Sequence, residues 1–306
     1  MKLDFLSIDI GGTNIKWAVI NRSGNIRKQW SLPTPQNKDD FFAALLSEIE
    51  DLQSKIRGIA ISCPGKVDST TGTVYFGGAL PFLDKISLKA VINQQYNLPV
   101  AIINDGKAAA LAELWMGNLQ EVTYGAAITL GTGLGGGLII DGKLIQGAHF
   151  QAGELSFMLK PAVEQSANIE NLYGFSGSAV GLIKRISGML NYPDLTDGKR
   201  VFAEIVAGNP LIYPIFSAYC REIAYVIINL QAAIDLEKVV IGGGISAQNI
   251  VIQEITKQYQ VLRKAIPLMK SSLTELNISA CQYRNEANLL GALYHLLLEV
   301  ETTEDY

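Results

Sequence analysis

Two glycine-rich loops and three acidic side chains are the features of this 306-residue chain whose types and spacing could do chemistry. The first loop reads Asp9-Ile10-Gly11-Gly12-Thr13-Asn14. Glycines let backbone N–H groups approach phosphate oxygens closely, and the Thr13 hydroxyl adds a donor. A carboxylate at the end of a buried strand, as predicted for Asp9, can hold the water shell of Mg²⁺. The alternative is an ordinary hairpin turn.

The second loop, Leu130–Gly137, offers the same chemistry. Its candidate phosphate-binding residues are Gly131, Thr132 and Gly133. A glycine-rich strand pair packed on a helix is the alternative interpretation. Two such loops at equivalent places of a duplicated chain favour a site in which both loops bind one polyphosphate, each from its own side. Neither loop has the spacing of a P-loop, and neither leads at once into a helix as a dinucleotide site requires.

A third glycine cluster follows the apolar run 239–241. It consists of Gly242, Gly243 and Gly244. Without side chains, this backbone could lie against a flat adenine ring, although a tight turn between strand and helix explains it equally.

Asp105 stands where the apolar run 101–103 gives way to an alanine-rich helix. A carboxylate in that place is most often a helix N-cap. The functional alternative is a general base that takes a proton from a substrate hydroxyl as phosphate arrives, with Asn104 binding the same substrate. Glu154, after Gly153, could accept hydrogen bonds from two vicinal sugar hydroxyls, or could be an ordinary surface carboxylate.

Short apolar runs and helical spacing predict the elements that position these residues. Strands are expected at 3–10, 15–21, 25–32, 56–63, 100–104, 123–130, 134–141, 238–242 and 276–283. Helices are expected at 38–54, 87–96, from 105, between 178 and 233 with breaks, and at 286–298. Pro64-Gly65 predicts a turn. This order indicates mixed α/β architecture.

Residues 7–20 align without gaps to residues 127–140, with Gly11 on Gly131. The match predicts a duplication in which each half opens with a strand, a loop and a strand. We therefore expect two similar domains with a cleft between them. The first comprises 1–118 with 286–306, and the second comprises 119–285.

Composition excludes several classes of protein. The net charge is −4 without a basic block, which argues against nucleic acid as a partner. No apolar run reaches the roughly 18 residues of a membrane span, and an acid among the first residues disfavours a signal peptide. Three cysteines far apart indicate neither disulfides nor a cysteine-built metal site. A cytoplasmic protein is expected, and the apolar helix 211–234 could serve as core or as a homodimer interface.

Taken together, these motifs resemble the ROK family of bacterial sugar kinases and repressors, over nearly the whole chain. The resemblance implies the actin-like ATPase fold, with ATP and Mg²⁺ as cofactors and a sugar as acceptor. It implies that Asp105 is the catalytic aspartate and that the three glycine clusters bind ATP. The implied sugar-binding residues are Pro64, Gly65, Asn104, Asp105 and Glu154.

The chain departs from the family after Glu154. Most members continue as G-E-x-G-H and then C-x-C-G-x-x-G-C-x-E, which binds zinc, whereas this chain has Phe157 in place of that histidine and no cysteine between 158 and 175. No structural zinc is therefore expected, and Glu170 is the nearest match to the final glutamate. Zinc-free members similar to β-glucoside kinases are the nearer resemblance.

The predicted activity is ATP-dependent phosphorylation of a hexose unit, at its 6-hydroxyl. The loops Tyr75–Leu83 and Val163–Phe175 are expected to select the sugar. A sugar-binding regulator without turnover is the alternative. ROK repressors carry a helix-turn-helix before the first loop, and Asp9 lies too near the first residue to leave room for one.

Overall fold

The computed structural model describes residues 4–160 and 168–304, and the chain divides into two compact units. Unit 1 comprises Met1–Gly117, Leu144–Ala152 and Asn285–Tyr306, and unit 2 comprises Asn118–Lys143 and Gly153–Arg284. The domain boundaries expected from the sequence stay a prediction. Within the described ranges, no helix has the length and apolar character that a membrane span needs.

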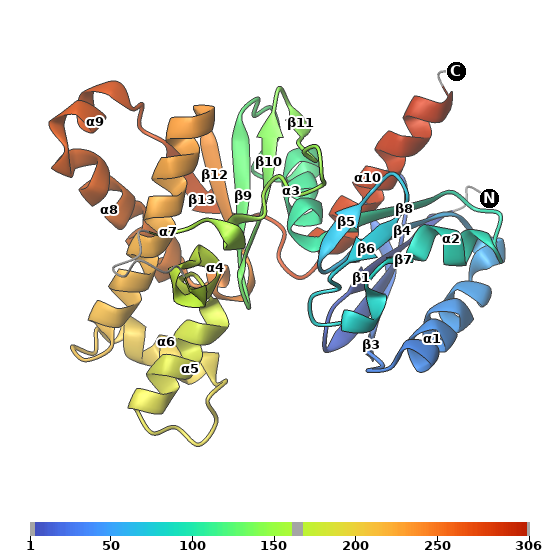
Figure 1. Ribbon diagram of the computed structural model, residues 1–306, viewed down its shortest axis with the longest axis horizontal. Coiled ribbons are helices and arrows are strands. Elements are labelled where there is room, and N and C mark those ends of the chain that lie inside the picture. The colour runs from blue at the N-terminus through green and yellow to red at the C-terminus, as the bar shows by residue number, and fades with distance from the viewer. Residues whose placement is uncertain (1–3, 161–167, 305–306) are drawn as a thin grey trace. The chain divides into compact units, whose positions relative to one another are not determined.

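Unit 1 is built on a five-stranded sheet of order β3-β2-β1-β4-β8 (Figure 1). Its strands are β1 (Asp4–Ile10), β2 (Asn14–Ile20), β3 (Ile26–Pro33), β4 (Ile56–Cys63) and β8 (Val100–Asn104). The first three form an antiparallel meander, and β4 and β8 add to β1 in parallel. Strands β1, β4 and β8 are buried almost throughout, which explains their continuous apolar sequences.

Helices α1 (Lys38–Glu50), α2 (Leu88–Asn93), α3 (Asp105–Met116) and α10 (Ala287–Glu304) complete the unit. The last helix packs directly on α3. A Cβ atom added to Gly291 would lie 1.7 Å from the carbonyl oxygen of Ala108, so only glycine permits this approach. Trp115 and Tyr294 stack farther along the same contact, with ring centroids 5.1 Å apart. The C-terminal helix thereby supports the helix that begins at Asp105.

Unit 2 repeats this plan with a sheet of order β11-β10-β9-β12-β13. Its strands are β9 (Gly125–Leu130), β10 (Leu134–Ile140), β11 (Lys143–Leu144), β12 (Lys238–Gly242) and β13 (Asn277–Ala280). Its helices are α4 (Tyr173–Ser176), α5 (Ala179–Met189), α6 (Gly198–Val206), α7 (Tyr213–Ile234), α8 (Asn249–Ala265) and α9 (Pro267–Ser272). The apolar segment predicted at 211–234 contributes much of the core of this unit.

As the predicted duplication requires, each unit opens with a strand, a loop and an antiparallel strand, and the two sheets share strand order, but the gapless alignment is wrong in the second strand. Ile10 pairs with Ile15 across four loop residues, whereas Leu130 pairs with Leu134 across three. The buried pattern of β2 from Ile15 accordingly recurs in β10 from Leu134, one residue earlier than the alignment gives. A shift of one residue exchanges the two faces of a strand, so burial decides the match.

Sequence patterns missed a small sheet in unit 1. It contains β5 (Lys66–Asp68), β6 (Thr73–Tyr75) and β7 (Ile86–Ser87), which are too short to show a periodicity. Helices α8 and α9 were also missed, apart from the helix start after the third glycine cluster. Of the predicted specificity loops, residues 163–167 lie outside the described residues.

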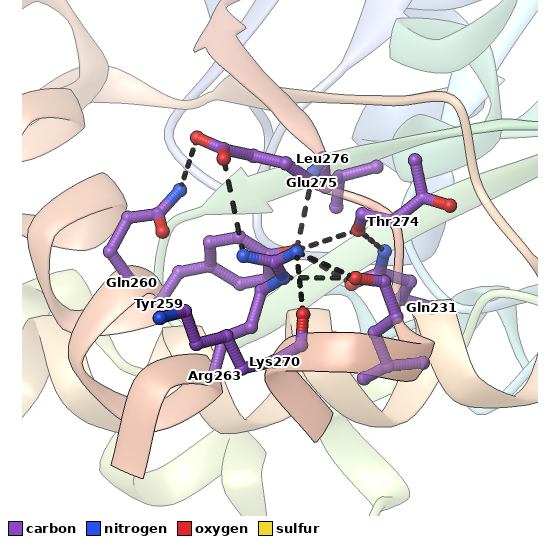
Figure 2. Close-up of polar contacts among 9 residues, drawn as sticks. Gln231, Tyr259, Gln260, Arg263, Lys270, Thr274, Glu275 and Leu276 are labelled. Atoms are coloured by element: carbon purple, nitrogen blue, oxygen red, sulfur yellow. Dashed lines mark hydrogen bonds and ion pairs between the residues drawn. The ribbon is translucent and has the colours of Figure 1, made fainter. Parts of the chain in front are cut away.

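A hydrogen-bond network fixes the chain between α9 and β13 (Figure 2). The fully buried hydroxyl of Tyr259 donates to Gln231 Oε1 at 2.8 Å and accepts from the backbone N–H of Leu276 at 3.2 Å. The Gln231 amide donates to the carbonyl oxygen of Thr274 at 2.6 Å, and Arg263 donates to that of Leu273 at 2.8 Å. These bonds satisfy backbone groups that the loop would otherwise bury without partners.

We expect Tyr259→Phe to lower the free energy of unfolding by about 1–3 kcal/mol, because it leaves a buried N–H and a buried amide oxygen without a partner. Urea unfolding at fixed pH measures this change. Arg22→Ala is the control, since its ion pair with Glu301 is exposed on both sides and should contribute less than about 1 kcal/mol. Equal stabilities of Tyr259→Phe and the wild type would contradict the prediction.

Candidate active site

Asp105 begins α3 but does not cap it. The cap is Asn104, whose Oδ1 accepts from the backbone N–H of Lys107 at 3.2 Å. Oδ1 of Asp105 accepts from the N–H of Gly106 at 2.8 Å and from Asn104 Nδ2 at 2.9 Å. Apart from the backbone N–H of Asp105 itself, no described residue donates to its other oxygen, Oδ2. The interpretation of Asp105 as a plain helix cap is therefore wrong, and one carboxylate oxygen is available for other chemistry.

The surroundings of this carboxyl favour its protonated form. Burial and, to a smaller extent, the carboxylate of Asp9 together raise the pKa of Asp105 to about 6, against hydrogen bonds from Gly106, Asn104 and its own backbone N–H that lower it. Such a group changes its protonation near neutral pH, as a general base or acid requires.

The end of β4 lies beside Asp105. Asn104 Nδ2 donates to the carbonyl oxygen of Gly65 at 2.9 Å, so the predicted Pro64-Gly65 turn is tied to the start of α3. Gly65 has a φ of 89°, and a Cβ on it would lie 2.8 Å from the carbonyl oxygen of Tyr75. Glycine is required here because the small sheet of β5 to β7 approaches so closely.

Asp9 is 5% exposed and hydrogen-bonded through both oxygens. Its Oδ1 accepts from Ser62 Oγ at 3.2 Å and from Asn288 Nδ2 at 3.0 Å, and its Oδ2 lies 3.3 Å from Lys16 Nζ. An oxygen donor fits Mg²⁺, and a carboxylate already bonded in this way fits contact through a bound water better than direct coordination. Ser62 and Asn288 left no signal in the sequence, whereas Lys16 follows from the register, because it pairs directly with Asp9.

The first glycine loop has its carbonyl groups occupied and its central N–H groups free. Thr34 bonds to the carbonyl oxygens of Gly11 and Thr13, and Gln36 bonds to that of Gly12. The N–H groups of Gly12 and Thr13 donate to no described residue, and the side chains of Thr13 and Asn14 are exposed. Free N–H groups on a fixed loop can bind an anion.

The second and third glycine clusters lie together in unit 2. Gly243 has a φ of 92°, and a Cβ on it would lie 2.2 Å from the carbonyl oxygen of Leu130, directly before the second loop. The loop is closed by the N–H of Gly131 bonding to Gly133, and its Thr132 side chain is exposed. Gly131, Thr132, Gly133, Gly242, Gly243 and Gly244 are thus brought to one place in this unit.

A pocket of about 770 Å³ adjoins this place, and Thr132, Ser156 and Glu170 are among its lining residues. Glu154 lies in unit 2 after Gly153, whose φ of 85° allows close approach to Gly136. Among residues 4–160 and 168–304, no three His, Cys, Asp or Glu side chains gather as a metal site would require. The expected lack of zinc stays a prediction.

The chain matches the model of the ROK family over residues 5–298. A β-glucoside kinase from Listeria innocua is 30% identical over 96% of this chain and 97% of its own length. A glucokinase from Halalkalibacterium halodurans is 28% identical over 83% and 84%. A crystal structure of a ROK family protein from Streptococcus pneumoniae in complex with sucrose has 31% identity and a TM-score of 0.86, covering 98% of this chain and 100% of that one. The chain belongs to the ROK family and has its actin-like ATPase fold.

Proposed function

We propose that this ROK family chain transfers the γ-phosphoryl group of ATP to the 6-hydroxyl of a hexose or a hexose-containing glycoside. The observation that carries the proposal is Asp105, a carboxyl whose Oδ2 accepts from no other residue in the described ranges and whose pKa is about 6. The curated relatives named β-glucoside kinase and glucokinase support the reaction class. The sucrose complex of the Streptococcus pneumoniae protein supports a glycoside as acceptor.

In the proposed mechanism, Asp105 Oδ2 accepts the proton of the sugar hydroxyl. At the same time the oxygen of this hydroxyl bonds to the γ-phosphorus of ATP, and the bond between the γ-phosphorus and ADP breaks. The proton later passes to water. Asn104, Pro64, Gly65 and Glu154 are the proposed sugar-binding residues. The hydrogen bonds of Asn104 to Asp105 and Gly65 give it the rigidity that orienting a hydroxyl requires.

The phosphate groups are assigned to the two loops. The free N–H groups of Gly12 and Thr13 would bind phosphate oxygens, together with Gly11 and Asn14 of the same loop. In unit 2 the proposed ATP-binding residues are Gly131, Thr132, Gly133, Gly242, Gly243 and Gly244. Asp9 would hold Mg²⁺ through water, and the ion would supply positive charge that offsets the charge of the phosphates. Lys16, paired with Asp9, keeps this carboxylate oriented.

A sugar-binding regulator without turnover remains the second candidate, and a coupled assay of sugar-dependent ADP release separates the two. A panel with glucose, N-acetylmannosamine, cellobiose and sucrose would identify the acceptor. Sugar binding without ADP release would overturn the kinase proposal. We further propose a cytoplasmic protein, with neither nucleic acid nor membrane as partner. The predicted homodimer also stays a proposal.

We expect Asp105→Asn to lower kcat by roughly 10²–10⁴ while sugar binding changes little, because the amide keeps a hydrogen bond but cannot accept the proton. The same variant should melt at a higher temperature at pH 7. The folded-state pKa of Asp105 lies above its unfolded value, so its stabilising effect is present at low pH and is lost as pH rises through about 6. Near wild-type kcat would show that Asp105 is no general base.

We expect kcat/KM of the wild type to fall about tenfold per unit as pH drops below about 6, since protonated Asp105 cannot act as a base. Initial rates from about pH 4.5 to pH 8 at saturating Mg²⁺ measure this profile. Asp105→Asn is the control and should show no such inflection. A wild-type profile that is flat between pH 5 and pH 7 would contradict the assignment.

We expect Thr13→Val and Thr132→Val each to raise the KM for ATP or lower kcat by about tenfold, because each removes a hydroxyl donor from a phosphate loop. Melting temperatures should stay near the wild type, as both side chains are exposed. Thr196→Val, in another exposed loop of unit 2, is the matched control. If both loop variants have the kcat and the KM for ATP of the wild type, the two hydroxyl groups do not bind the phosphates.

A further inference from the structure

Lys107 is a buried lysine two residues after Asp105. It is 1% exposed, and an ammonium group in the protein interior is costly unless its donors are satisfied. Its Nζ donates to the carbonyl oxygen of Gln146 at 3.3 Å, to Gln146 Oε1 at 3.0 Å and to the carbonyl oxygen of Phe150 at 2.8 Å. These acceptors hydrogen-bond to an ammonium group that has three N–H donors.

These acceptors belong to the segment Leu144–Ala152, which packs with unit 1 although the chain before and after it belongs to unit 2. Beyond Leu144 the segment has no helix or strand. Phe150 has a φ of 58°, a left-handed conformation that a bulky residue rarely adopts. Within the segment, the backbone N–H of Phe150 donates to the carbonyl oxygen of Gly147, and that of Ala152 donates to the carbonyl oxygen of Gln146. The conformation of the segment therefore depends on contacts with α3.

One hydrogen-bond chain links this segment to Asp105. The backbone N–H of Lys107 donates to Asn104 Oδ1 at 3.2 Å, and Asn104 Nδ2 donates to Asp105 Oδ1 at 2.9 Å. The side chain of Lys107 thus bonds to the segment, and its backbone N–H bonds to the side-chain amide of Asn104. A displacement of the segment would therefore act on Lys107 and, through it, on Asn104, which is hydrogen-bonded to the carboxyl group of Asp105.

We propose that Lys107 is a positioning residue that fixes the segment 144–152 beside Asp105, so that the exposed side chains of His149 and Gln151 contact the acceptor sugar. Both carry polar atoms that can form hydrogen bonds with the hydroxyls of an uncharged sugar. The proposal rests on the proposed kinase function. Lys107 itself touches neither substrate, and its effect passes through the segment.

Lys107→Met tests the proposal because methionine keeps the length of the side chain and removes its donors. Hydrogen–deuterium exchange without ligands should accelerate at least tenfold for the N–H groups of Phe150 and Ala152, and much less in the sheet of unit 1. The sugar KM should rise roughly tenfold to a hundredfold, while the ATP KM stays within about twofold. Lys89→Met, which removes a partly exposed ion pair with Glu299 in the same unit, should change neither KM.

Gln146→Leu removes one of the three acceptors and decides the question if Lys107→Met does not fold. It should raise the sugar KM by about two- to fivefold with the wild-type melting temperature. Unchanged exchange, or faster exchange with an unchanged sugar KM, would overturn the proposal. If the wild type releases no ADP with any sugar, the kinase function fails, and the exchange measurement alone still decides whether Lys107 fixes the segment.

Discussion

The parallel pairing of β1, β4 and β8 is the constraint on which the candidate site depends. In this register Asp9 lies opposite Ser62, and Cys63 lies opposite Asn104. The carboxyl ends of the three strands therefore meet at one edge of the sheet, where α/β proteins bind their ligands. Asp9 is the second-last residue of β1, and the Pro64-Gly65 turn and Asp105 directly follow β4 and β8. A slip of one residue in any strand would turn these side chains to the other face.

The carboxyl groups of Asp9 and Asp105 differ in their hydrogen-bond partners, and this difference favours a different chemical role for each. Asp9 accepts from Ser62 and Asn288 on one oxygen and contacts Lys16 with the other, so both of its oxygens have partners. Asp105 receives two donors on one oxygen and, apart from its own backbone N–H, none from the described residues on the other, and its pKa lies near neutrality. Two neighbouring carboxyl groups in unlike environments commonly divide electrostatic and proton-transfer work. The same division is expected here.

Much of the fold could be predicted because its central strands β1, β4, β9 and β12 are largely apolar runs that end at or directly before glycine or proline. The position of Asp105 between a strand and a helix was also evident, since 101–103 and 108–112 differ so clearly in composition. Contacts between distant parts of the chain could not be predicted. Asn288 reaches Asp9 only because α10 returns to β1, and nothing local marks it. The cap role of Asn104 was hidden because Asp105 is an equally good cap by residue type.

The segment 144–152 shows why strand and helix patterns alone do not define a site. It has no periodicity, and its strained residue Phe150 would be a poor choice for a turn by composition. A buried ammonium group bonds to it at three places, whereas a lysine in an alanine-rich helix would be expected from the sequence to be solvated. Burial reverses that interpretation, because a charge that is 1% exposed must find its acceptors nearby. The helix that begins at Asp105 therefore also bonds, through Lys107, to the loop that precedes Glu154 in the chain, and a change at Lys107 would act on both.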